Sequence, residues 1–519
     1  MSSVTTPPQQ DVSINSEPSR TEPKNEPVQV PEVTDELPPD IVLPRGNSEP
    51  VPKYHGTSRI FPLSHLKHSK KKLRYRLEVN YKTINHVLYD RGWSQVHGES
   101  DAWDFFWCDL SHLGAVLEKR LQGSQMVPHF RNHYEISRKN HLARNMARYK
   151  KTLQREGRPE EAKFCDCIPL TFELPGEYAI LMSYCRVNPG KNFIVKPAIG
   201  CKGKGIFLFR KIRELNEWRA TRDWSRNTTV IETNDKTDQP KMEEKETPPE
   251  MWLVQTYVDD PYLIAGRKFD IRVYVLVLSY LPLKVWVARD GFARICGAPY
   301  DLNNLKDTLA HLTNTSIQLA RDNKNPGCKW SMKRLREFLC AKHGTPAFEL
   351  LMEQIGQIII TSLKSVQKAM MHNKHCFELY GYDILLSESL RPWLIEVNAS
   401  PSLEATDADD YKLKYNLLSD VFNVLDLEGI LVGTELRVGG FDLLWDDGPV
   451  HKPCPSPDEC GPVCKKPLLN IHLGGLNDRV RHLQDLQDWK HLMIDNAVKI
   501  KPEDEKSTKK ETSNHLIGF

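Results

Sequence analysis

The chain lacks any apolar run near the roughly 18 residues that a membrane-spanning helix needs. The best candidate, residues 271–283, contains Arg272 and is typical of a buried strand. The N-terminus lacks the charged-then-apolar order of a secretory signal peptide. The 12 cysteines are scattered without the spacing of a disulfide framework. We therefore expect no membrane association and a reducing compartment.

A strong excess of one charge sign is also missing, because the formal net charge is only +3. Near-neutral charge by itself identifies no partner. What the chain does have is length. Its 519 residues, 39% of them hydrophobic, exceed what one hydrophobic core usually serves. We therefore expect a soluble globular body of two or three domains or lobes.

Both ends of the chain have the composition of disordered tails. Residues 1–58 hold eleven of the 35 prolines, separated mainly by Ser, Thr, Glu and Gln. Such a segment cannot bury enough apolar surface to offset its chain entropy. We expect a disordered tail over 1–58 and an irregular, partly disordered tail over 446–519.

Charged and polar side chains stand at the ends of short, strand-like apolar runs. Lys268–Arg272 leads directly into Val273–Leu278, a later run carries Asp383, and the next carries Glu396 and Asn398. Such oxygen atoms are the hard ligands that Mg²⁺ takes together with nucleotide phosphates, and an arginine there is placed to meet an anion. Each charge alone is more often a strand-end residue reaching solvent. The whole set favours a nucleotide site.

A glycine-rich segment precedes these strands. Residues 193–209 contain two apolar runs joined by glycines and lysines, which predicts a hairpin. Glycine lets backbone N–H groups approach phosphate oxygens, while Lys196 and Lys204 bring charge to the same place. No helix-opening Gly-Lys-Ser/Thr follows, so the segment is not a Walker A motif. A plain tight turn is the alternative, and the order of the later motifs argues against it.

Six segments, taken in order, resemble the tubulin tyrosine ligase-like family over residues 70–445. Two further segments, Cys376–Asp383 and Arg437–Val450, are most similar to a ciliary polyglutamylase branch. The six segments are Lys196–Gly205, Leu253–Val258, Lys268–Arg272, His311–Asn314, Tyr382–Leu385 and Glu396–Pro401.

This resemblance implies a set of site residues. Asp383, Glu396 and Asn398 would hold Mg²⁺, and Arg272 would stabilise the transferring phosphoryl group. Arg294 matches the family position that binds the carboxylate of the incoming amino acid. The implied nucleotide-binding residues are Lys196, Lys204 and Gly205 at the phosphates, Gln255, Thr256, Tyr257 and Val258 at the adenine, and Lys268, Asp270, Thr313 and Asn314 beside them.

The resemblance also implies a reaction and its setting. With ATP and Mg²⁺, free L-glutamate would be ligated to glutamate side chains of the acidic tubulin C-terminal tail through an acyl phosphate. The implied partners are tubulin and microtubules, with accessory subunits left open. The implied location is the cytoplasm and cytoskeleton, including the axoneme and basal body of a cilium or flagellum.

One position departs from the family pattern. Where the family usually has Thr-Asn followed five residues after the Asn by a lysine, this chain has Leu319. Leucine offers no donor to a carboxylate, so either Arg321 or Lys324 substitutes or affinity for glutamate is low. Two alternatives to glutamate ligation therefore remain open: a glycine ligase of the same fold, and an inactive microtubule-binding scaffold.

Alternating strands and helices predict an α+β architecture, and the resemblance implies that it is an ATP-grasp ligase fold. A strand–helix–strand order over 73–109 suggests a small N-terminal α/β domain at 59–125. A central lobe over 126–260 and a C-terminal lobe over 261–445, which carries the Mg²⁺ site, would follow. The patterns predict helices at 139–155 and 348–372, strands at 252–256, 271–280 and 283–288, and a mobile loop at 232–250.

Two runs are strongly basic: residues 67–76 and 131–151. They are consistent with solvated surface or with docking of an acidic tubulin tail. Nucleic acid is not expected, because exposed aromatic residues rarely interleave with the charge. His451, Cys454, Cys460, Cys464 and His472 have irregular spacing for zinc, so free thiols are favoured over a metal site.

Overall fold

The computed structural model describes residues 72–78, 81–98, 100–198, 203, 205–221, 227–230, 244–247, 251–319, 327–453 and 467–499. They all lie within one compact unit, Lys53–Phe519. Several expectations fall outside the described residues: the tail over 1–58, the basic residues 67–71, Lys204, Arg321, Lys324, Cys454, Cys460, Cys464 and residues 500–519.

The first described elements form a small parallel sheet. Strand β1 (Arg74–Leu77) pairs with both β2 (Ser94–Gln95) and β3 (Phe105–Trp107). Helix α1 (Lys82–Asp90) connects β1 to β2 and packs its apolar side chains on helix α12 (Ala408–Leu425). The predicted strand–helix–strand order is confirmed.

A second sheet has four antiparallel strands in the order β5-β10-β6-β7. Because β6 pairs with β7, the predicted glycine-rich hairpin is confirmed, as is the predicted strand at 252–256. Leucine and cysteine side chains of helices α6 and α7 cover one face of this sheet. The bounds are β5 (Thr171–Leu174), β6 (Phe193–Pro197), β7 (Phe207–Phe209), β10 (Trp252–Thr256), α6 (Tyr178–Val187) and α7 (Ile212–Ala220).

The third sheet is the largest and is centred on strand β12 (Arg267–Tyr280). β12 pairs in antiparallel fashion with β13 (Leu283–Ala288), β14 (Phe292–Ile295) and β16 (Cys376–Leu386). Strand β17 (Pro392–Asn398) pairs with the far edge of β16. The predicted strands at 271–280 and 283–288 are confirmed.

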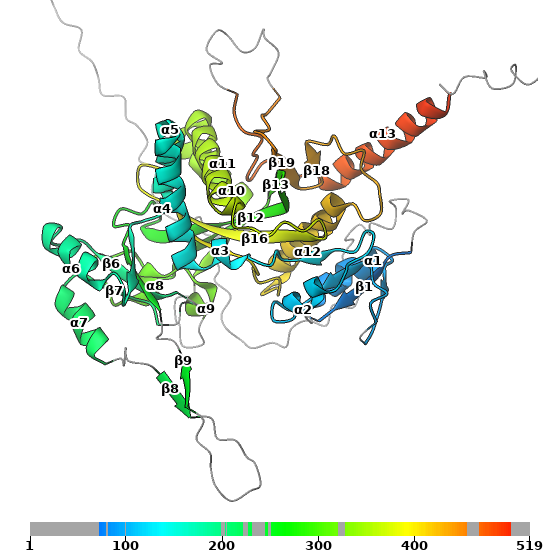
Figure 1. Ribbon diagram of the computed structural model, residues 1–519. Helices are drawn as coiled ribbons and strands as arrows, with labels where there is room; N and C mark the ends of the chain where they lie inside the picture. The colour runs from blue at the N-terminus through cyan, green and yellow to red at the C-terminus, as the bar shows by residue number, and fades with distance from the viewer. Residues whose placement is uncertain are drawn as a thin grey trace, which may run out of the picture. The chain divides into compact units, whose positions relative to one another are not determined.

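Alternation along β12 divides the core into two layers. Val275 and its alternate neighbours pack with helix α11 (Thr345–Gln367), whereas Leu276 packs with helix α12. Successive side chains of a strand point to opposite faces, so the two helices cover opposite faces of the sheet (Figure 1). A mixed helix-and-sheet architecture is therefore confirmed.

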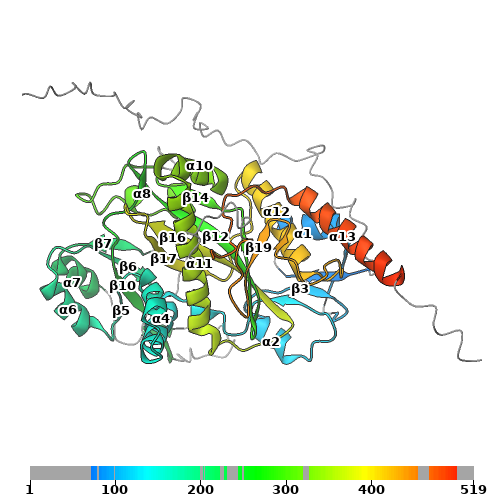
Figure 2. The same ribbon diagram turned by 90° about the horizontal axis from the view of Figure 1, so that it is seen from above.

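Helix α4 (Lys139–Arg155) has the bounds that the sequence predicts. It lies beside α11 (Figure 2) and contacts it. Among the described residues, no helix is long and apolar enough to cross a membrane. The other elements are α2 (Leu113–Glu118), β4 (Val127–Pro128), α3 (Tyr134–Ser137), α5 (Pro159–Ala162), the 3-10 helix Lys163–Cys167, β11 (Leu263–Ile264), α8 (Thr308–His311), α9 (Thr315–Gln318), β15 (Cys328–Ser331), α10 (Met332–His343), β18 (Arg437–Val438), β19 (Phe441–Asp446) and α13 (Arg479–Lys499).

The structure differs from the sequence-based expectation in several places. The tail expected to be irregular over 446–519 contains helix α13, and its residues Leu469, Ile471 and Leu473 are buried in the core. The helix expected at 348–372 is α11, Thr345–Gln367. The expected loop at 232–250 contains strand β9 (Glu244–Thr247), which pairs with β8 (Asn227–Val230); the rest of that loop lies outside the described residues. Asp383 and Arg272 also lie inside their strands, with buried residues on both sides, rather than at strand ends. They can be buried there because they pair with each other.

Candidate active site

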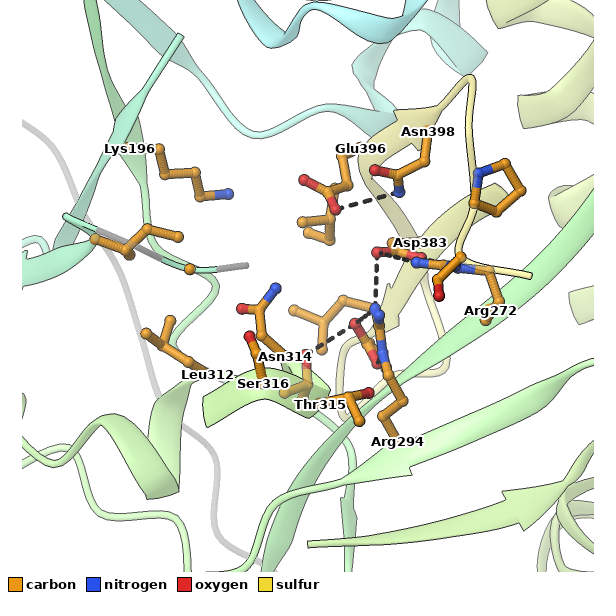
Figure 3. Close-up of a pocket in the computed structure, with 18 of the residues that line it drawn as sticks. Lys196, Arg272, Arg294, Leu312, Asn314, Thr315, Ser316, Asp383, Glu396 and Asn398 are labelled. Atoms are coloured by element: carbon orange, nitrogen blue, oxygen red, sulfur yellow. Dashed lines mark hydrogen bonds and ion pairs between the residues drawn. The ribbon is translucent and has the colours of Figure 1, made fainter. Parts of the chain in front are cut away.

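A single cavity of about 540 Å³ brings together most of the predicted site residues (Figure 3). Its walls come from β6, β10, β12, β14, β16 and β17, so residues distant in the sequence meet there. The predicted residues that line it are Lys196, Gln255, Thr256, Tyr257, Val258, Lys268, Asp270, Arg272, Arg294, Thr313, Asn314, Asp383, Glu396 and Asn398.

Two predicted residues are not placed in this lining. Gly205 adopts a φ of +74°, and a Cβ there would lie 2.9 Å from the Trp252 ring, so it packs against β10. Gly203 does line the cavity, at a φ of +73°. A left-handed φ is accessible to glycine at little cost, which explains the residue type at both positions. Lys204 lies outside the described residues.

Two buried lysines form what we call the lysine end of the cavity. Lys196 donates to Gln255 Oε1 at 3.0 Å, and Lys268 donates to Tyr257 Oη at 2.8 Å and to the His311 carbonyl at 3.0 Å. Within the described residues, no carboxylate forms an ion pair with either ammonium group. Burial lowers the pKa of both lysines to about 8. A buried cation that meets only neutral partners is suited to an anionic ligand.

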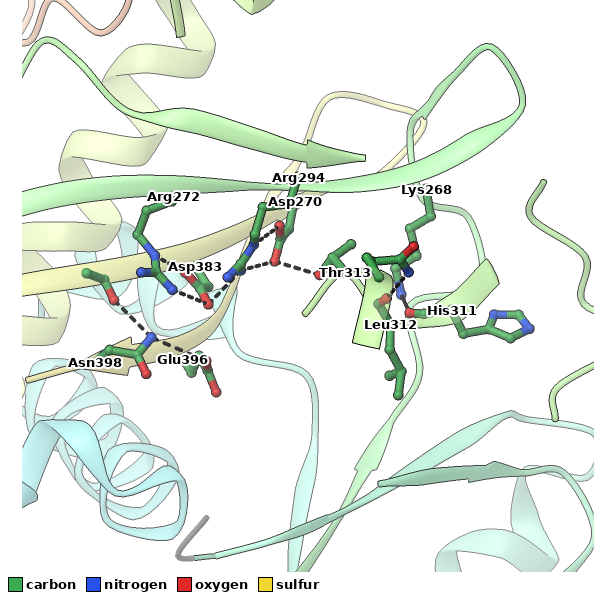
Figure 4. Close-up of polar contacts among 12 residues, drawn as sticks. Lys268, Asp270, Arg272, Arg294, His311, Leu312, Thr313, Asp383, Glu396 and Asn398 are labelled. Atoms are coloured by element: carbon green, nitrogen blue, oxygen red, sulfur yellow. Dashed lines mark hydrogen bonds and ion pairs between the residues drawn. The ribbon is translucent and has the colours of Figure 1, made fainter. Parts of the chain in front are cut away.

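Four residues form what we call the arginine end (Figure 4). Arg272 donates from Nε to Asp383 Oδ1 at 2.5 Å and from Nη2 to Asp383 Oδ2 at 3.1 Å. Arg294 donates from Nε to Asp270 Oδ1 at 2.7 Å, and its Nη2 contacts both Asp270 Oδ2 and, at 2.7 Å, Asp383 Oδ2. The two guanidinium groups are therefore matched by two carboxylates.

Strand register creates these pairs. Arg272 lies opposite Asp383 across β12 and β16, and Asp270 lies opposite Arg294 across β12 and β14. Gly381 makes room, because a Cβ there would come within 3.2 Å of the Arg272 side chain. Burial acts to raise the pKa of Asp383, but the two guanidinium groups outweigh it and hold that pKa well below its ordinary value. Asp383 is therefore ionised at neutral pH.

The other two predicted metal ligands, Glu396 and Asn398, lie between these two ends (Figure 3). Glu396 is opposite Asp383 in the register, and Asn398 follows on the same face of β17. Asn398 Nδ2 donates to Glu396 Oε1 at 3.2 Å, while Lys139 contacts Glu396 Oε2 at 2.9 Å. No group of three or more His, Cys, Asp or Glu that could hold a metal occurs in the described part of the chain.

The residues present nevertheless fit a divalent cation bound together with phosphates. Two carboxylates and one amide oxygen converge on the cavity, and Mg²⁺ is usually held by one or two carboxylates plus substrate phosphates. Lys196 lies across the cavity from Glu396 (Figure 3), and Lys196 and Lys268 would receive those phosphates. The donor chemistry thus suits a magnesium nucleotide better than an isolated ion.

Sequence reasoning missed several lining residues. Lys329 and Lys414 line the cavity and share Asp410, at 3.4 Å and 2.8 Å. Burial lowers the pKa of Lys414, as do the charges of Lys329 and Arg272. One sequence signal was available, because Asp410 and Lys414 stand one helical turn apart. Lys329 and Lys414 thus add two further cations to the cavity that Arg272 and Arg294 line.

Lys139 is also a missed residue, since in the sequence it is only one member of the basic run 131–151, for which solvated surface and docking of an acidic tail were both open. Other members of that basic run are paired within the molecule: Arg144 with Glu173 at 2.8 Å and Lys150 with Asp166 at 2.6 Å. Leu319 ends helix α9, and its side chain is 51% exposed and outside the cavity lining.

The lysine end, the arginine end and the oxygen atoms between them have the chemistry that suits a phosphate-bearing substrate, in a mixed helix-and-sheet protein. The sequence pattern of the Tubulin-tyrosine ligase family matches residues 117–431. The chain belongs to this family.

Curated relatives match over most of their length. The chain is 43% identical to "Probable tubulin polyglutamylase TTLL9" of Bos taurus, over 80% of this chain and 94% of that protein. It is 40% identical to "Probable tubulin polyglutamylase ttll-9" of Caenorhabditis elegans, over 72% and 85% of the two chains. It is 36% identical to "Probable alpha-tubulin polyglutamylase Ttll1" of Tetrahymena thermophila, over 74% and 95%.

Proposed function

We propose that the chain is an ATP-dependent tubulin polyglutamylase with an ATP-grasp fold. The observation that carries this proposal is the cavity itself, where two unmatched buried lysines face a set of hard oxygen ligands. Membership of the family and the names of the relatives supply the substrate class. The enzyme would act on microtubules in the cytoskeleton, including those of cilia or flagella, with or without accessory subunits.

The chain's residues divide the work along the cavity. Gln255 to Val258 line the end suited to adenine, and Lys196 and Lys268 would bind phosphate oxygens. Asp383, Glu396 and Asn398 would hold Mg²⁺, which supplies charge neutralisation for phosphoryl transfer. Thr313 donates to Asp270 at 2.8 Å and so fixes the loop that ends at Asn314, which would lie beside a bound nucleotide.

The chemistry is amide formation in two steps. The acceptor glutamate carboxylate attacks the γ-phosphorus, the bond to the β-phosphate oxygen breaks, and ADP leaves. The α-amine of free L-glutamate then attacks the acyl carbon, phosphate leaves and the amine loses a proton. Arg272 is placed to donate hydrogen bonds to oxygen atoms that gain charge in both steps. Asp383 orients that guanidinium group through two hydrogen bonds.

Glutamate is favoured over glycine as the donor by the cations beyond the arginine end. Arg294 would bind one carboxylate of the donor, and Lys329 and Lys414 offer charge for a second carboxylate. Glycine has no second carboxylate to use them. These two lysines would also supply positive charge to the donor in place of the lysine that the family usually has where this chain has Leu319.

Incubation of the purified chain with microtubules, ATP, Mg²⁺ and either labelled glutamate or labelled glycine tests the proposal. We expect glutamate to be incorporated, and Glu396→Gln to abolish transfer while fold and microtubule binding persist, because an amide supplies no charge to the cation. Incorporation of glycine alone would identify the chain as a glycine ligase instead. If no amino acid is transferred, even with cell extract present, the scaffold alternative becomes correct.

A further inference from the structure

The ammonium group of Lys139 contacts a carboxylate oxygen of Glu396 that a bound metal ion would need. It lies 2.9 Å from Glu396 Oε2, while Glu396 Oε1 accepts a hydrogen bond from Asn398. Both side chains of the ion pair are largely buried, at 18% and 19% exposure. Solvent therefore screens this contact only in part.

The other predicted carboxylate ligand is matched as well. Asp383 accepts hydrogen bonds from Arg272 and also contacts Arg294. With Glu396 matched by Lys139, the candidate ligands present no unbalanced negative charge in the described structure. A divalent cation entering alone would therefore meet a neutral oxygen cluster and a nearby ammonium that repels it.

Lys139 also lies close to the phosphate-facing side of the cavity. It lines the cavity, and its charge lowers the pKa of Lys196, after the larger effect of burial. It is the first residue of the 17-residue helix α4, whose side chains Leu142, Met146 and Leu153 are buried in the core. Helix α4 thus holds the backbone at Lys139 in place, while the Lys139 side chain contacts Glu396 in the same cavity that Lys196 lines.

We propose that Lys139 couples divalent-cation binding to nucleotide binding. Without nucleotide, its ammonium group neutralises Glu396 and disfavours the cation. When nucleotide binds, the ammonium group moves to the phosphate farthest from the base, and Glu396 is released to ligate the cation. Lys139 then acts as a positioning residue for Glu396 and as a phosphate contact. This inference rests on the proposed nucleotide site, but not on the identity of the amino acid or of the acceptor.

The test measures Mn²⁺ affinity by electron paramagnetic resonance, with and without a non-hydrolysable ATP analogue. We expect Lys139→Met to bind Mn²⁺ without nucleotide about tenfold more tightly than the wild type, because one repelling charge is lost. The factor by which the analogue tightens Mn²⁺ binding should fall in Lys139→Met, and by reciprocity so should the factor by which Mn²⁺ tightens analogue binding.

Two variants serve as controls. Lys151→Met removes an exposed lysine of the same helix outside the cavity and should behave as the wild type. Lys139→Arg keeps the charge and should keep the coupling. If Lys139→Met does not fold, Lys139→Gln tests the same loss of charge. Unchanged or weaker Mn²⁺ binding by the charge-removing variant in the absence of nucleotide would overturn the proposal.

The outcome is separable from the proposed function. These binding measurements need neither tubulin nor glutamate, so failure of amino-acid transfer leaves them interpretable. A lysine with a merely structural role would change thermal stability without a change in coupling. Failure of wild-type Mn²⁺ and analogue to tighten each other's binding would also refute the coupling, whatever the transfer assay gives.

Discussion

The two ends of the cavity handle buried charge in opposite ways. At the lysine end, Lys196 and Lys268 meet only neutral hydrogen-bond acceptors. At the arginine end, Arg272 and Arg294 are matched by two carboxylates in a closed set of ion pairs. Unmatched buried charge costs stability but is available to a ligand, whereas matched charge is stable and fixes geometry.

This difference assigns separate tasks to the two ends. Under the proposed function, the lysine end would supply uncompensated positive charge to nucleotide phosphates. The arginine end holds its guanidinium groups in one orientation, which suits groups that must meet charge developing during the reaction. Substitutions at the two ends should therefore have opposite effects: loss of stability at the arginine end, and loss of nucleotide affinity without loss of stability at the lysine end.

The largest effect is expected when a match at the arginine end is broken. Asp383→Asn leaves Arg272 and part of Arg294 buried without their counter-charge. Breaking a buried pair costs about 3 to 5 kcal/mol, and we expect a loss of unfolding free energy of that order in urea titrations. Amino-acid transfer should be lost as well.

A matched control lies on the same sheet at the surface. Asp446 pairs with Lys284 at 2.9 Å, and its side chain is 44% exposed. Asp446→Asn should change the unfolding free energy by less than about 1 kcal/mol, because solvent screens exposed pairs. Equal effects of the two substitutions would contradict the matched-charge description.

The opposite result is expected at the lysine end. Lys268→Met removes a buried ammonium group that has no carboxylate partner, so thermal stability should not fall. Nucleotide affinity, measured by calorimetry, should fall by about one to two decades, the value of a hydrogen bond to a charged group. Lys284→Met, outside the cavity, serves as the control. A destabilised Lys268→Met variant with normal nucleotide affinity would contradict the assignment of the lysine end to nucleotide binding.

The same contrast has a pH dependence. The pKa of Lys196 and of Lys268 is lowered to about 8 in the folded protein. The native state therefore binds fewer protons than the unfolded state near pH 9, so these lysines make the free protein more stable as pH rises. Nucleotide affinity should change in the other direction, weakening as pH rises through about 8.

Residue types at this site were predictable from the sequence, but their matching was not. Lys196, Arg272 and Asp383 stand out because a charge interrupts an apolar run, and the strands that carry them are confirmed. Whether each charge is matched depends on cross-strand register, and a slip of one residue would turn every side chain to the other face. Nothing local in the sequence states that Arg272 lies opposite Asp383.

Contacts between distant elements were also out of reach. Lys139 meets Glu396 only because helix α4 begins at the wall of the cavity. In the sequence, this lysine is one of several basic residues with helical spacing, and most of the others lie on the surface. Lys329 and Lys414 were missed for the same reason, since one is on a strand and the other is on a helix far along the chain.

The smallest effect is expected at Leu319, where an unmatched charge can be added near the arginine end. Leu319→Lys introduces an ammonium group at the end of α9, whose residues Thr315 and Ser316 line the cavity. The leucine side chain is 51% exposed, so stability should be unchanged. If the new lysine reaches the donor carboxylate, the KM for glutamate should fall by about one decade, the lower value for a charge-assisted hydrogen bond.

Steady-state kinetics with labelled glutamate measures this change, with the KM for ATP as the internal control. An unchanged glutamate KM would mean that Lys329 and Lys414 already supply the charge that the donor needs. In that case Lys414→Met should raise the glutamate KM. Asp410 pairs with both Lys414 and Lys329, so Lys414→Met still leaves that carboxylate one cationic partner. Lys414→Met should therefore destabilise the fold less than Asp383→Asn does. The glutamate KM thus separates a cation that serves the substrate from one that serves only the fold.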